Sequence, residues 1–329
     1  MGTSDNLAGQ VEPADTERTS MGYLKDCKVT EVLEKKAFTL SAEVIPPRNG
    51  EQMQATMAGL KKVVASGVDF LSVTKGAGGS LRGGSLPIAQ TIKDQFAKPC
   101  IAHFTCRDLT PQDIENQLVD HHYFGVRNIL ALRGDPPMGE KDWVPPLGGY
   151  DYAFQLIEQI QKLNNGEFLE RKGFKVLSRE ATDFCIGAAI YPEHPDGKER
   201  LHFAELKFRA GAEFGITQML FDPDPYRDLS KSLQEKGYQQ PILPGLRILR
   251  SKKQAHVMKT RFGCSVPDWY LKQLPEEHDK NNLDLTALIP FVELVDRLKE
   301  VGAPGVHIFV LTDVALCQEA MKELQGRYN

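Results

Sequence analysis

The chain has 329 residues, of which 41% are hydrophobic and 26% charged, and its formal net charge is -4 at pH 7. This is the composition of a globular protein, and the nearly balanced charge excludes a basic surface that binds nucleic acid. No apolar run approaches the roughly 20 residues of a membrane-spanning helix, so we expect no membrane span. The polar start of the chain lacks the basic-then-apolar order of a secretory signal, and we expect a cytoplasmic protein.

Cysteine and histidine usage gives no sign of a metal site. No two of the six cysteines form a C-x-x-C pair, and the eight histidines show no metal-binding spacing. We therefore expect no metal, and thiols that are reduced and packed as small hydrophobic side chains. The cysteines are Cys27, Cys100, Cys106, Cys185, Cys264 and Cys317.

Residues 1–22 are mostly small and polar, and we expect them to form a disordered tail before a single domain over residues 23–329. The domain begins a repeated alternation of strand-like and helical patterns. Near-continuous apolar character predicts strands that are buried on both faces, as in a parallel sheet covered by helices. The eight predicted strands are Phe38–Ile45, Phe70–Thr74, Cys100–Thr105, Arg127–Leu132, Phe184–Tyr191, Gly215–Phe221, Pro241–Leu246 and Val306–Leu311.

Helical patterns lie between these strands. Apolar residues recur at helical spacing from residue 53 to residue 64, and Thr110 followed by Pro111 and Asp113 predicts a capped helix start. Further helices are predicted over residues 201–212 and 288–298. Eight strands alternating with helices favour a (β/α)8 TIM barrel over an open doubly wound sheet. The long connections 135–180 and 263–284 are expected to lie near a site.

Polar residues at the carboxyl ends of the predicted strands are the candidates for function, because barrel enzymes carry their chemistry there. Glu43 lies within an apolar strand, where burial would raise its pKa and suit a general acid, although a structural ion pair is equally consistent. His103 ends the third strand, either as a hydrogen-bonded core residue or as a ligand-binding one. Arg133 and Asp135 end the fourth, either as a mutual salt bridge or with separate roles toward a phosphate and a heterocycle.

Two further loops carry candidate residues. The glycine-rich segment 74–85 can be a flexible surface loop or a phosphate-binding loop, and it matches neither the Walker pattern nor G-x-G-x-x-G. Gln218 at the end of the sixth strand can bind a pterin or flavin ring or cap the following helix.

Taken together, these segments resemble the methylenetetrahydrofolate reductase family, in order and approximate spacing. The family is a (β/α)8 barrel with a flavin at the carboxyl ends of the strands, so the resemblance implies the fold that the alternation predicts. The matching segments are Glu43–Arg48, Leu71–Ala77, His103–Cys106, Ala131–Pro137, Tyr191–Pro195, Lys207–Ala212, Ile216–Gln218 and Pro244–Gly245.

The resemblance implies a ping-pong reaction in one-carbon metabolism and methionine biosynthesis. NADH or NADPH would reduce the flavin, FAD or alternatively FMN, and the reduced flavin would convert 5,10-methylenetetrahydrofolate to 5-methyltetrahydrofolate. Glu43 matches the acid that protonates the folate N10, and Asp135 matches the catalytic aspartate near the pterin and the flavin. Gln218 and Met258 match substrate-binding positions. The positions implied to bind the flavin are Thr74, Lys75, His103, Leu132, Arg133, Gly134, Asp135, Tyr191, His194 and Lys207.

The sequence departs from the family at several of these positions. Lys75 stands where the family commonly has tyrosine, Arg200 where it has an acid, and Asp313 where it usually has arginine. A divergent folate oxidoreductase that takes electrons from a partner subunit, or a folate-binding relative without activity, therefore stays open. We also expect a homo-oligomer and, because the chain stops at Asn329, no feedback control through an appended domain.

Overall fold

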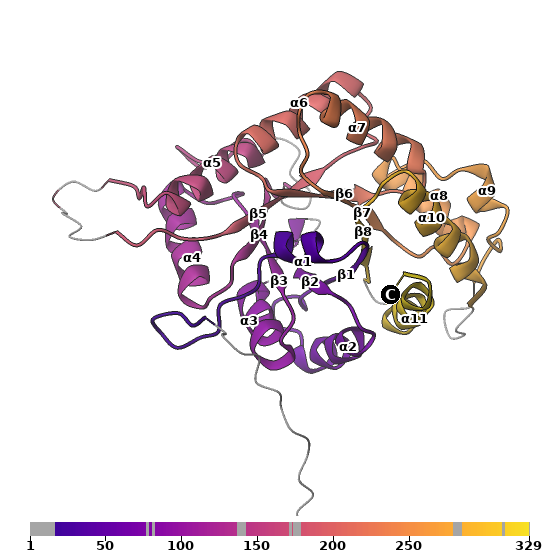
Figure 1. Cartoon of the computed structure of the whole chain (residues 1–329), viewed down its shortest axis with the longest axis horizontal. Helices are drawn as coiled ribbons and strands as arrows, with labels where there is room; N and C mark the ends of the chain where they lie inside the picture. The colour runs from indigo at the N-terminus through magenta and orange to yellow at the C-terminus, as the bar shows by residue number, and fades with distance from the viewer. Residues whose placement is uncertain are drawn as a thin grey trace, which may run out of the picture.

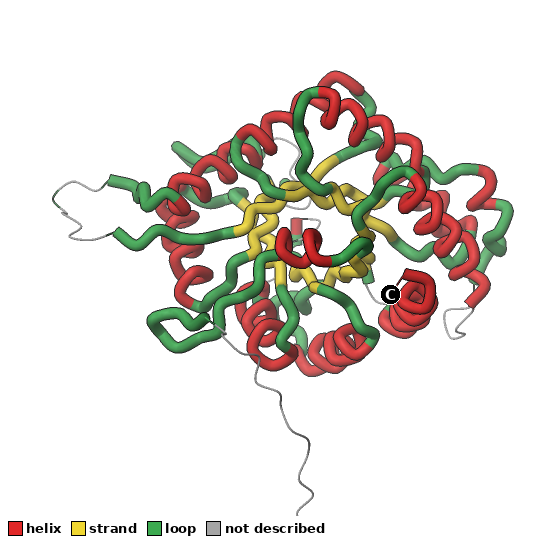
Figure 2. Tube along the Cα trace, viewed as in Figure 1, coloured by secondary structure: helices red, strands yellow, loops and turns green. Residues whose placement is uncertain are grey.

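Eight parallel strands close into a barrel in the order β1-β2-β3-β4-β5-β6-β7-β8, and helices surround the ring of strands (Figure 2). This confirms the predicted (β/α)8 fold. The computed structural model describes residues 17–76, 79–80, 83–136, 143–170, 173, 179–278, 285–310 and 313–328. Of the predicted tail, residues 1–16 lie outside this range, whereas residues 17–22 belong to an antiparallel turn in which Arg18 pairs with Leu24.

All eight predicted strands are present, with ends within about two residues of the expected positions. Each strand pairs in parallel with its sequence neighbours, and β8 closes the ring against β1. The strands are β1 (Thr39–Val44), β2 (Phe70–Val73), β3 (Cys100–Thr105), β4 (Asn128–Leu132), β5 (Cys185–Ile190), β6 (Phe214–Met219), β7 (Ile242–Leu246) and β8 (Gly305–Phe309).

The outer layer consists of helices whose apolar faces pack against the strands and form the larger part of the core (Figure 1). The helices are α1 (Val29–Lys35), α2 (Met53–Ala65), α3 (Ser85–Phe96), α4 (Pro111–Tyr123), α5 (Ala153–Asn164), α6 (Gly197–Arg209), α7 (Pro223–Glu235), α8 (Lys252–Phe262), α9 (Asp268–Leu271), η2 (Leu285–Ala287), α10 (Leu288–Glu300) and α11 (Val314–Tyr328). The four predicted helices correspond to α2, α4, α6 and α10.

The start of α4 shows the capping that its sequence predicts. Thr110 Oγ1 accepts a hydrogen bond from the backbone N–H of Asp113 at 3.3 Å, and the Asp113 carboxylate accepts one from the N–H of Thr110 at 3.0 Å. Pro111 occupies the first turn, where its missing N–H costs nothing. The long connections contain α5 and α9, so they carry regular structure of their own.

Inside the barrel, every second residue of each strand faces the axis, and these side chains form a second, smaller core. Helix α1 lies across the amino-terminal end of the ring, where Val29 and Leu33 pack against this interior core (Figure 1). The sequence patterns did not predict α1. The described residues contain no helix that is long and apolar enough to cross a bilayer. Five of the cysteines are buried, Cys27 is exposed, and all six are free thiols.

A buried hydrogen-bond network attaches the segment before α1 to the strands. One Asp26 carboxylate oxygen accepts from the N–H of Cys100 and from Asn128 Nδ2, both at 3.0 Å. Asn128 also donates to the Cys27 carbonyl at 2.9 Å and accepts from the N–H of Val29 at 2.8 Å. Desolvation raises the pKa of Asp26 to about 7, although these donors oppose the shift. The network therefore fixes the helix that closes the barrel.

We predict that Asp26→Ala lowers the free energy of unfolding by about 2–5 kcal/mol, because it leaves two buried N–H donors without an acceptor. Because folding raises the pKa of Asp26, its stabilising contribution is complete below about pH 4 and is lost as the pH rises through about 7. Asp26→Asn should flatten the pH dependence of unfolding over this window. Chemical denaturation of both variants between pH 4 and pH 8 measures this, and a profile unchanged in Asp26→Asn would contradict it.

Candidate active site

Glu43 is the acid that the closed barrel isolates most completely from solvent at its carboxyl-terminal end. It lies near the end of β1, faces the barrel axis as do Thr39 and Ser41, and is only 8% exposed. No described cation forms an ion pair with it except, nominally, His103. Desolvation raises the pKa of Glu43 to about 8, so the carboxyl group is protonated at neutral pH.

His103 of β3 is the neighbour of this acid. Its Nε2 lies 3.6 Å from Glu43 Oε2, and the same burial lowers the pKa of His103 to about 3. The two opposite shifts place the single proton of the pair on the carboxyl group, so a neutral acid faces a neutral imidazole. At 3.6 Å the contact is too long for a hydrogen bond, and Nε2 has no other hydrogen-bond partner among the described residues.

A polar column continues below this pair toward the centre of the barrel. His307 of β8 is fully buried, with Nδ1 2.8 Å from Ser41 Oγ and Nε2 3.0 Å from Ser72 Oγ. Since the Ser41 hydroxyl donates to the Val306 carbonyl at 3.0 Å, it accepts from His307 Nδ1–H, and Ser72 then donates to Nε2. The column keeps His307 in one neutral tautomer beneath the Glu43–His103 pair.

Thr74 supplies a second buried polar atom without a partner. It follows β2, is 3% exposed, and its Oγ1 has no hydrogen-bond partner in the part of the chain that the structure describes. Buried polar atoms in native proteins are almost always paired, so Thr74 Oγ1 and His103 Nε2 are available to a bound ligand. Leu132, at the end of β4, packs against the interior core beside them.

Lys75 points away from this region. Its Nζ donates to Gln117 Oε1 of α4 at 2.8 Å and lies 4.3 Å from the centroid of the Phe104 ring, on the outer side of β3. Burial lowers the pKa of Lys75 to about 8. The structure therefore places Lys75 between β3 and α4, apart from Thr74 and His103. Of the glycine-rich segment that follows, residues 77–78 and 81–82 lie outside the described range.

The segment after β4 turns sharply at Gly134. This residue has a φ of +91°, and a Cβ atom there would lie 2.8 Å from Arg107 Cβ. Arg107 donates a hydrogen bond to the backbone carbonyl of Asp135 and another to Asp108 at 2.9 Å. The turn leaves Arg133 and Asp135 exposed at the carboxyl end of β4.

A cationic cluster borders this turn. Lys207 of α6 is buried, donates to the Ala189 carbonyl at 2.7 Å, and lies 5.1 Å from the centroid of the Tyr191 ring. Desolvation and then the charge of Arg133 lower the pKa of Lys207 to about 8. Although almost half of Tyr191 is exposed, desolvation of its hydroxyl raises its pKa, Asp135 raises it further, and Arg133 opposes the shift. These four residues therefore share one electrostatic environment.

His194 lies outside this cluster, in the loop between β5 and α6. Its Nδ1 is 3.2 Å from the Asp196 carbonyl, and its Nε2 is 3.8 Å from Glu199. Nearby, Arg200 donates to the Pro192 carbonyl at 2.5 Å, which fixes the same loop. These contacts hold His194 within the loop, and its described contacts do not include Glu43.

On the next strand of the ring, Gln218 is exposed at the end of β6, where its Oε1 accepts from the N–H of Met219 at 2.8 Å. Met258 of α8 is buried, and its sulfur lies 3.5 Å from Arg247 Nη1. The segment after α8 is joined to β6 and β5: Cys264 donates to the Met219 carbonyl at 3.3 Å, and the N–H of Ser265 donates to Glu193 at 2.8 Å. Helix α8 therefore lies along this rim.

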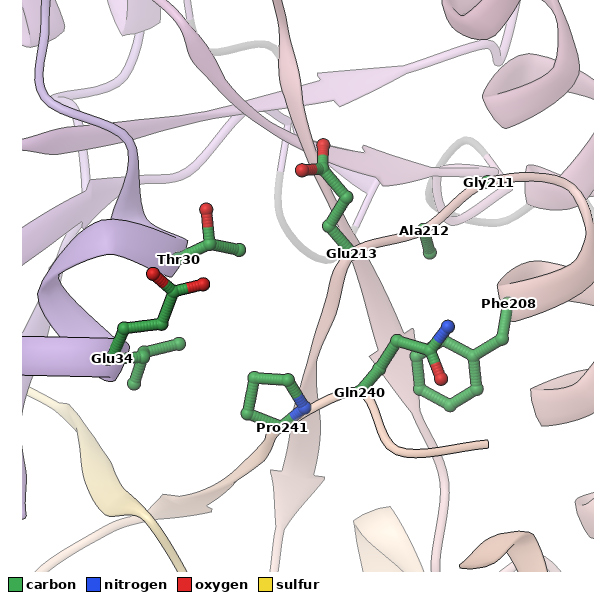
Figure 3. Close-up of a pocket in the computed structure, with 9 residues that line it drawn as sticks. Thr30, Glu34, Phe208, Gly211, Ala212, Glu213, Gln240 and Pro241 are labelled. Carbon is green, nitrogen blue, oxygen red and sulfur yellow. The ribbon is translucent and has the colours of Figure 1, made fainter. Parts of the chain in front are cut away.

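A cavity of about 600 Å³ is found at the other end of the barrel (Figure 3). Thr30 and Glu34 of α1 face Gln240 and Pro241, which precede β7, across this space. It is separated from Glu43 by the interior core, so it takes no part in the site at the carboxyl ends. No group of three or more potential metal ligands occurs within the described ranges.

Several residues of the site were not singled out from the sequence. Ser41, Ser72 and His307 share the strand alternation that turns Glu43 and His103 inward, so the period of two could have identified them. Arg247 directly follows β7, and the rule that polar residues at strand ends deserve scrutiny would have found it. Arg107 follows β3 in the same way.

A buried acid and a cluster of cations, both at the carboxyl ends of the strands, are typical of (β/α)8-barrel enzymes. The family model for methylenetetrahydrofolate reductase matches residues 28–325, so the chain belongs to this family, as its motifs indicate.

Individual relatives agree with the family match. Methylenetetrahydrofolate reductase 2 of Saccharomyces cerevisiae is 30% identical over 302 residues, which cover 86% of this chain and 47% of the yeast protein. The 5,10-methylenetetrahydrofolate reductase of Escherichia coli is 28% identical over 279 residues, covering 83% of this chain and 86% of the bacterial protein. The chain spans about half the length of the fungal and plant relatives that it matches.

Among solved structures, an uncharacterized Clostridium thermocellum protein, described as binding two copies of 5-methyl-5,6,7,8-tetrahydrofolic acid, is similar with a TM-score of 0.56. It is 16% identical, and the match covers 91% of this chain and 99% of that one. At this identity the likeness supports the fold alone.

The turn at Gly134 can be tested by substitution. Gly134→Ala should lower the free energy of unfolding by about 1–3 kcal/mol more than Gly148→Ala, because its Cβ also collides with Arg107. Gly148 is the matched control: its φ is +77° and nothing lies within 4 Å of its Cβ position, so Gly148→Ala measures the backbone strain alone. Chemical denaturation compares the two, and equal losses would show that the close approach to Arg107 is unimportant.

Proposed function

We propose that this protein reduces 5,10-methylenetetrahydrofolate to 5-methyltetrahydrofolate with a bound flavin and a reduced pyridine nucleotide. The observation that carries the proposal is the burial of the Glu43 carboxyl group at the carboxyl-terminal end of the barrel, which raises its pKa. Opening the imidazolidine ring of this substrate needs a proton at N10, and an acid with a pKa near 8 holds one at neutral pH. Membership of the family, together with the retained Glu43, Asp135 and Gln218, supports the same substrate.

The residues present fit a flavin. Thr74 Oγ1 and His103 Nε2 are buried polar atoms that have no hydrogen-bond partner among the described residues. A heterocycle that carries donors and acceptors can form hydrogen bonds with both. Lys207 and Arg133 supply positive charge for a phosphate group, with Tyr191 beside them. We infer FAD, with FMN as the alternative. When bound, the flavin accepts a hydride from NADH or NADPH and passes one to the folate carbon.

In this proposal Glu43 donates its proton to the folate N10, and His103 keeps the acid neutral without competing for the proton. A second carboxylate or a charged imidazole next to Glu43 would change its pKa, whereas neutral His103 leaves desolvation as the dominant influence. The His307 column beneath the pair holds this arrangement by fixed hydrogen bonds. In this proposal the Glu43 carboxyl group therefore carries its proton before the substrate binds.

Asp135 and Gln218 act on the substrate from the rim. Asp135 is exposed at the turn after β4, where its negative charge favours the cation that ring opening creates on the folate. The Gln218 side chain can both donate to and accept from a pterin ring. Its present bond to the N–H of Met219 occupies only Oε1, so its amide group stays free to donate.

The role of Glu43 predicts a pH dependence. Because burial raises its pKa to about 8, folate reduction should be fast below this pH and fall as the pH rises through it. Glu43→Gln should suppress methyltetrahydrofolate formation by about 10² or more and remove this pH dependence, while flavin reduction by the donor stays nearly unchanged. Anaerobic stopped-flow spectroscopy measures the two half-reactions separately.

Glu115→Gln is the matched control, since Glu115 is also a buried glutamate but lies on α4, where it accepts from the N–H of Leu169 at 2.8 Å. It should leave both half-reactions unchanged. Equal loss in the two half-reactions of Glu43→Gln would remove the assigned role.

Asp135→Asn should slow folate reduction about tenfold or more, as expected for about 1.4 kcal/mol of lost charge stabilisation, and leave flavin binding nearly intact. Asp222→Asn provides the control, because Asp222 lies at the same end of the barrel but caps α7, a role that asparagine fills equally well. Release of flavin as the main effect of Asp135→Asn would contradict the proposed role.

The electron donor is identified by the flavin spectrum. Bleaching of the bound flavin under anaerobic conditions by NADH or NADPH, followed by reoxidation with 5,10-methylenetetrahydrofolate, is the expected result. Bleaching only by a chemical reductant would instead support a partner subunit as the electron source. Protein that holds no flavin after incubation with FAD or FMN, and forms no methyltetrahydrofolate, would contradict the proposed function.

A further inference from the structure

Arg247 is a charged side chain at the rim of the barrel that makes little use of its hydrogen-bonding capacity toward the described residues. It directly follows β7 and lies half-buried between the end of this strand and α8. Its one hydrogen bond to a described residue runs from Nη1 to the sulfur of Met258, at 3.5 Å. A thioether is a weak acceptor, and a guanidinium carries five N–H donors.

Burying the Arg247 guanidinium with so few acceptors costs free energy unless a further partner binds it. Arg247 is half-buried, and this burial lowers the pKa of its guanidinium, an effect that the charge of Asp313 opposes only in part. A desolvated cation is retained where it meets an anion. Within the described residues, no carboxylate forms an ion pair with Arg247.

The acid near Arg247, Asp313, forms an ion pair with a different arginine. Asp313, which precedes α11, forms its ion pair with Arg250, with Nη1 and Oδ1 3.4 Å apart. Arg250 is only 7% exposed, whereas the Asp313 side chain is 42% exposed, and the two opposite charges offset each other. The group of three residues therefore keeps one net positive charge, and that charge is on Arg247.

The position of Arg247 relates this charge to the proposed substrate site. Its neighbour in the ring of strands, β6, ends with Gln218, and β7 and β6 pair at Gly245 and Met219. The segment after α8 is joined to the ends of β5 and β6, so Arg247 lies beneath the rim that α8 forms. A ligand that contacts Gln218 has Arg247 as the adjacent cation.

We propose that Arg247 is a specificity-determining residue that binds an oxyanion, a carboxylate or a phosphate, on the ligand at the carboxyl ends of the strands. This inference rests on the proposed function, in which the two molecules that use this face both carry such groups. Folates end in the carboxylates of glutamate, and pyridine nucleotides contain a diphosphate. The planar fork of arginine pairs with either group through two parallel hydrogen bonds.

The test compares ligands with and without the anion, on the flavin-bound full-length protein. Dissociation constants are measured for 5-methyltetrahydrofolate, for 5-methyltetrahydropteroate, which lacks glutamate, and for NADH and NADPH. Arg247→Met should weaken 5-methyltetrahydrofolate binding about 10- to 100-fold and leave the pteroate unchanged, as expected for charged hydrogen bonds. Arg247→Lys keeps the charge but loses the forked guanidinium. Its dissociation constant for 5-methyltetrahydrofolate should therefore lie between those of the unaltered protein and Arg247→Met. Arg227→Met, on the exposed surface of α7, is the control.

The outcomes separate the sources of the anion. A loss confined to the folate assigns its carboxylate, and a loss confined to the nucleotides assigns their phosphate. Equal losses for folate and pteroate with none for the nucleotides, or no loss for any ligand, would overturn the role of Arg247. If the unaltered protein binds neither folate nor pteroate, the proposed function fails, and the nucleotide measurements still test Arg247 by themselves.

Stability distinguishes binding from a structural role. Because Arg247 has only a thioether as acceptor, Arg247→Met should shift the thermal unfolding midpoint of the ligand-free protein by less than about 2 °C. Arg250→Met, which breaks the pair with Asp313, should lower it by more than about 5 °C. Equal shifts in the two variants would show that Arg247 serves the fold and would overturn the proposal.

Discussion

The site depends on the withdrawal of one carboxyl group from water by a closed ring of strands. In such a ring every second side chain must face the axis, so the alternation of β1 forces Glu43 into the interior once Leu40 and Ala42 face the helices. Desolvation is the cause of its raised pKa, since no nearby charge contributes to the shift. His103 responds to the same environment in the opposite sense and stays neutral. The inward alternation of side chains in the closed ring thus keeps both Glu43 and His103 uncharged.

Much of this fold could be predicted from the sequence because its strands are buried on both faces. Runs such as Phe184–Tyr191 are almost continuously apolar, and this character predicted all eight strands. Helix α1 could not be predicted in this way. It has only seven residues, and its role comes from Val29 and Leu33 filling a space that exists only after the barrel has closed. Its attachment through Asp26 and Asn128 joins residues about 100 positions apart, which no local pattern contains.

The same distinction applies to the site. The sequence identified Glu43 and His103 because a polar residue inside an apolar strand is conspicuous, and it identified the Arg133–Asp135 turn because a strand end is the place where barrels carry function. Side-chain direction outside the strands is less predictable. Lys75 and Met258 align with positions of interest in the family, yet Lys75 lies against α4 and Met258 is a buried residue of α8. The unused donors of Arg247 become visible only when its neighbours are known.

The position of α1 determines from which end of the barrel a ligand can reach Glu43. Because this helix and the apolar side chains of the interior core fill the amino-terminal end of the barrel, a ligand reaches Glu43 from the carboxyl-terminal end. A ligand that binds beside Glu43 must therefore also leave from the carboxyl-terminal end of the barrel.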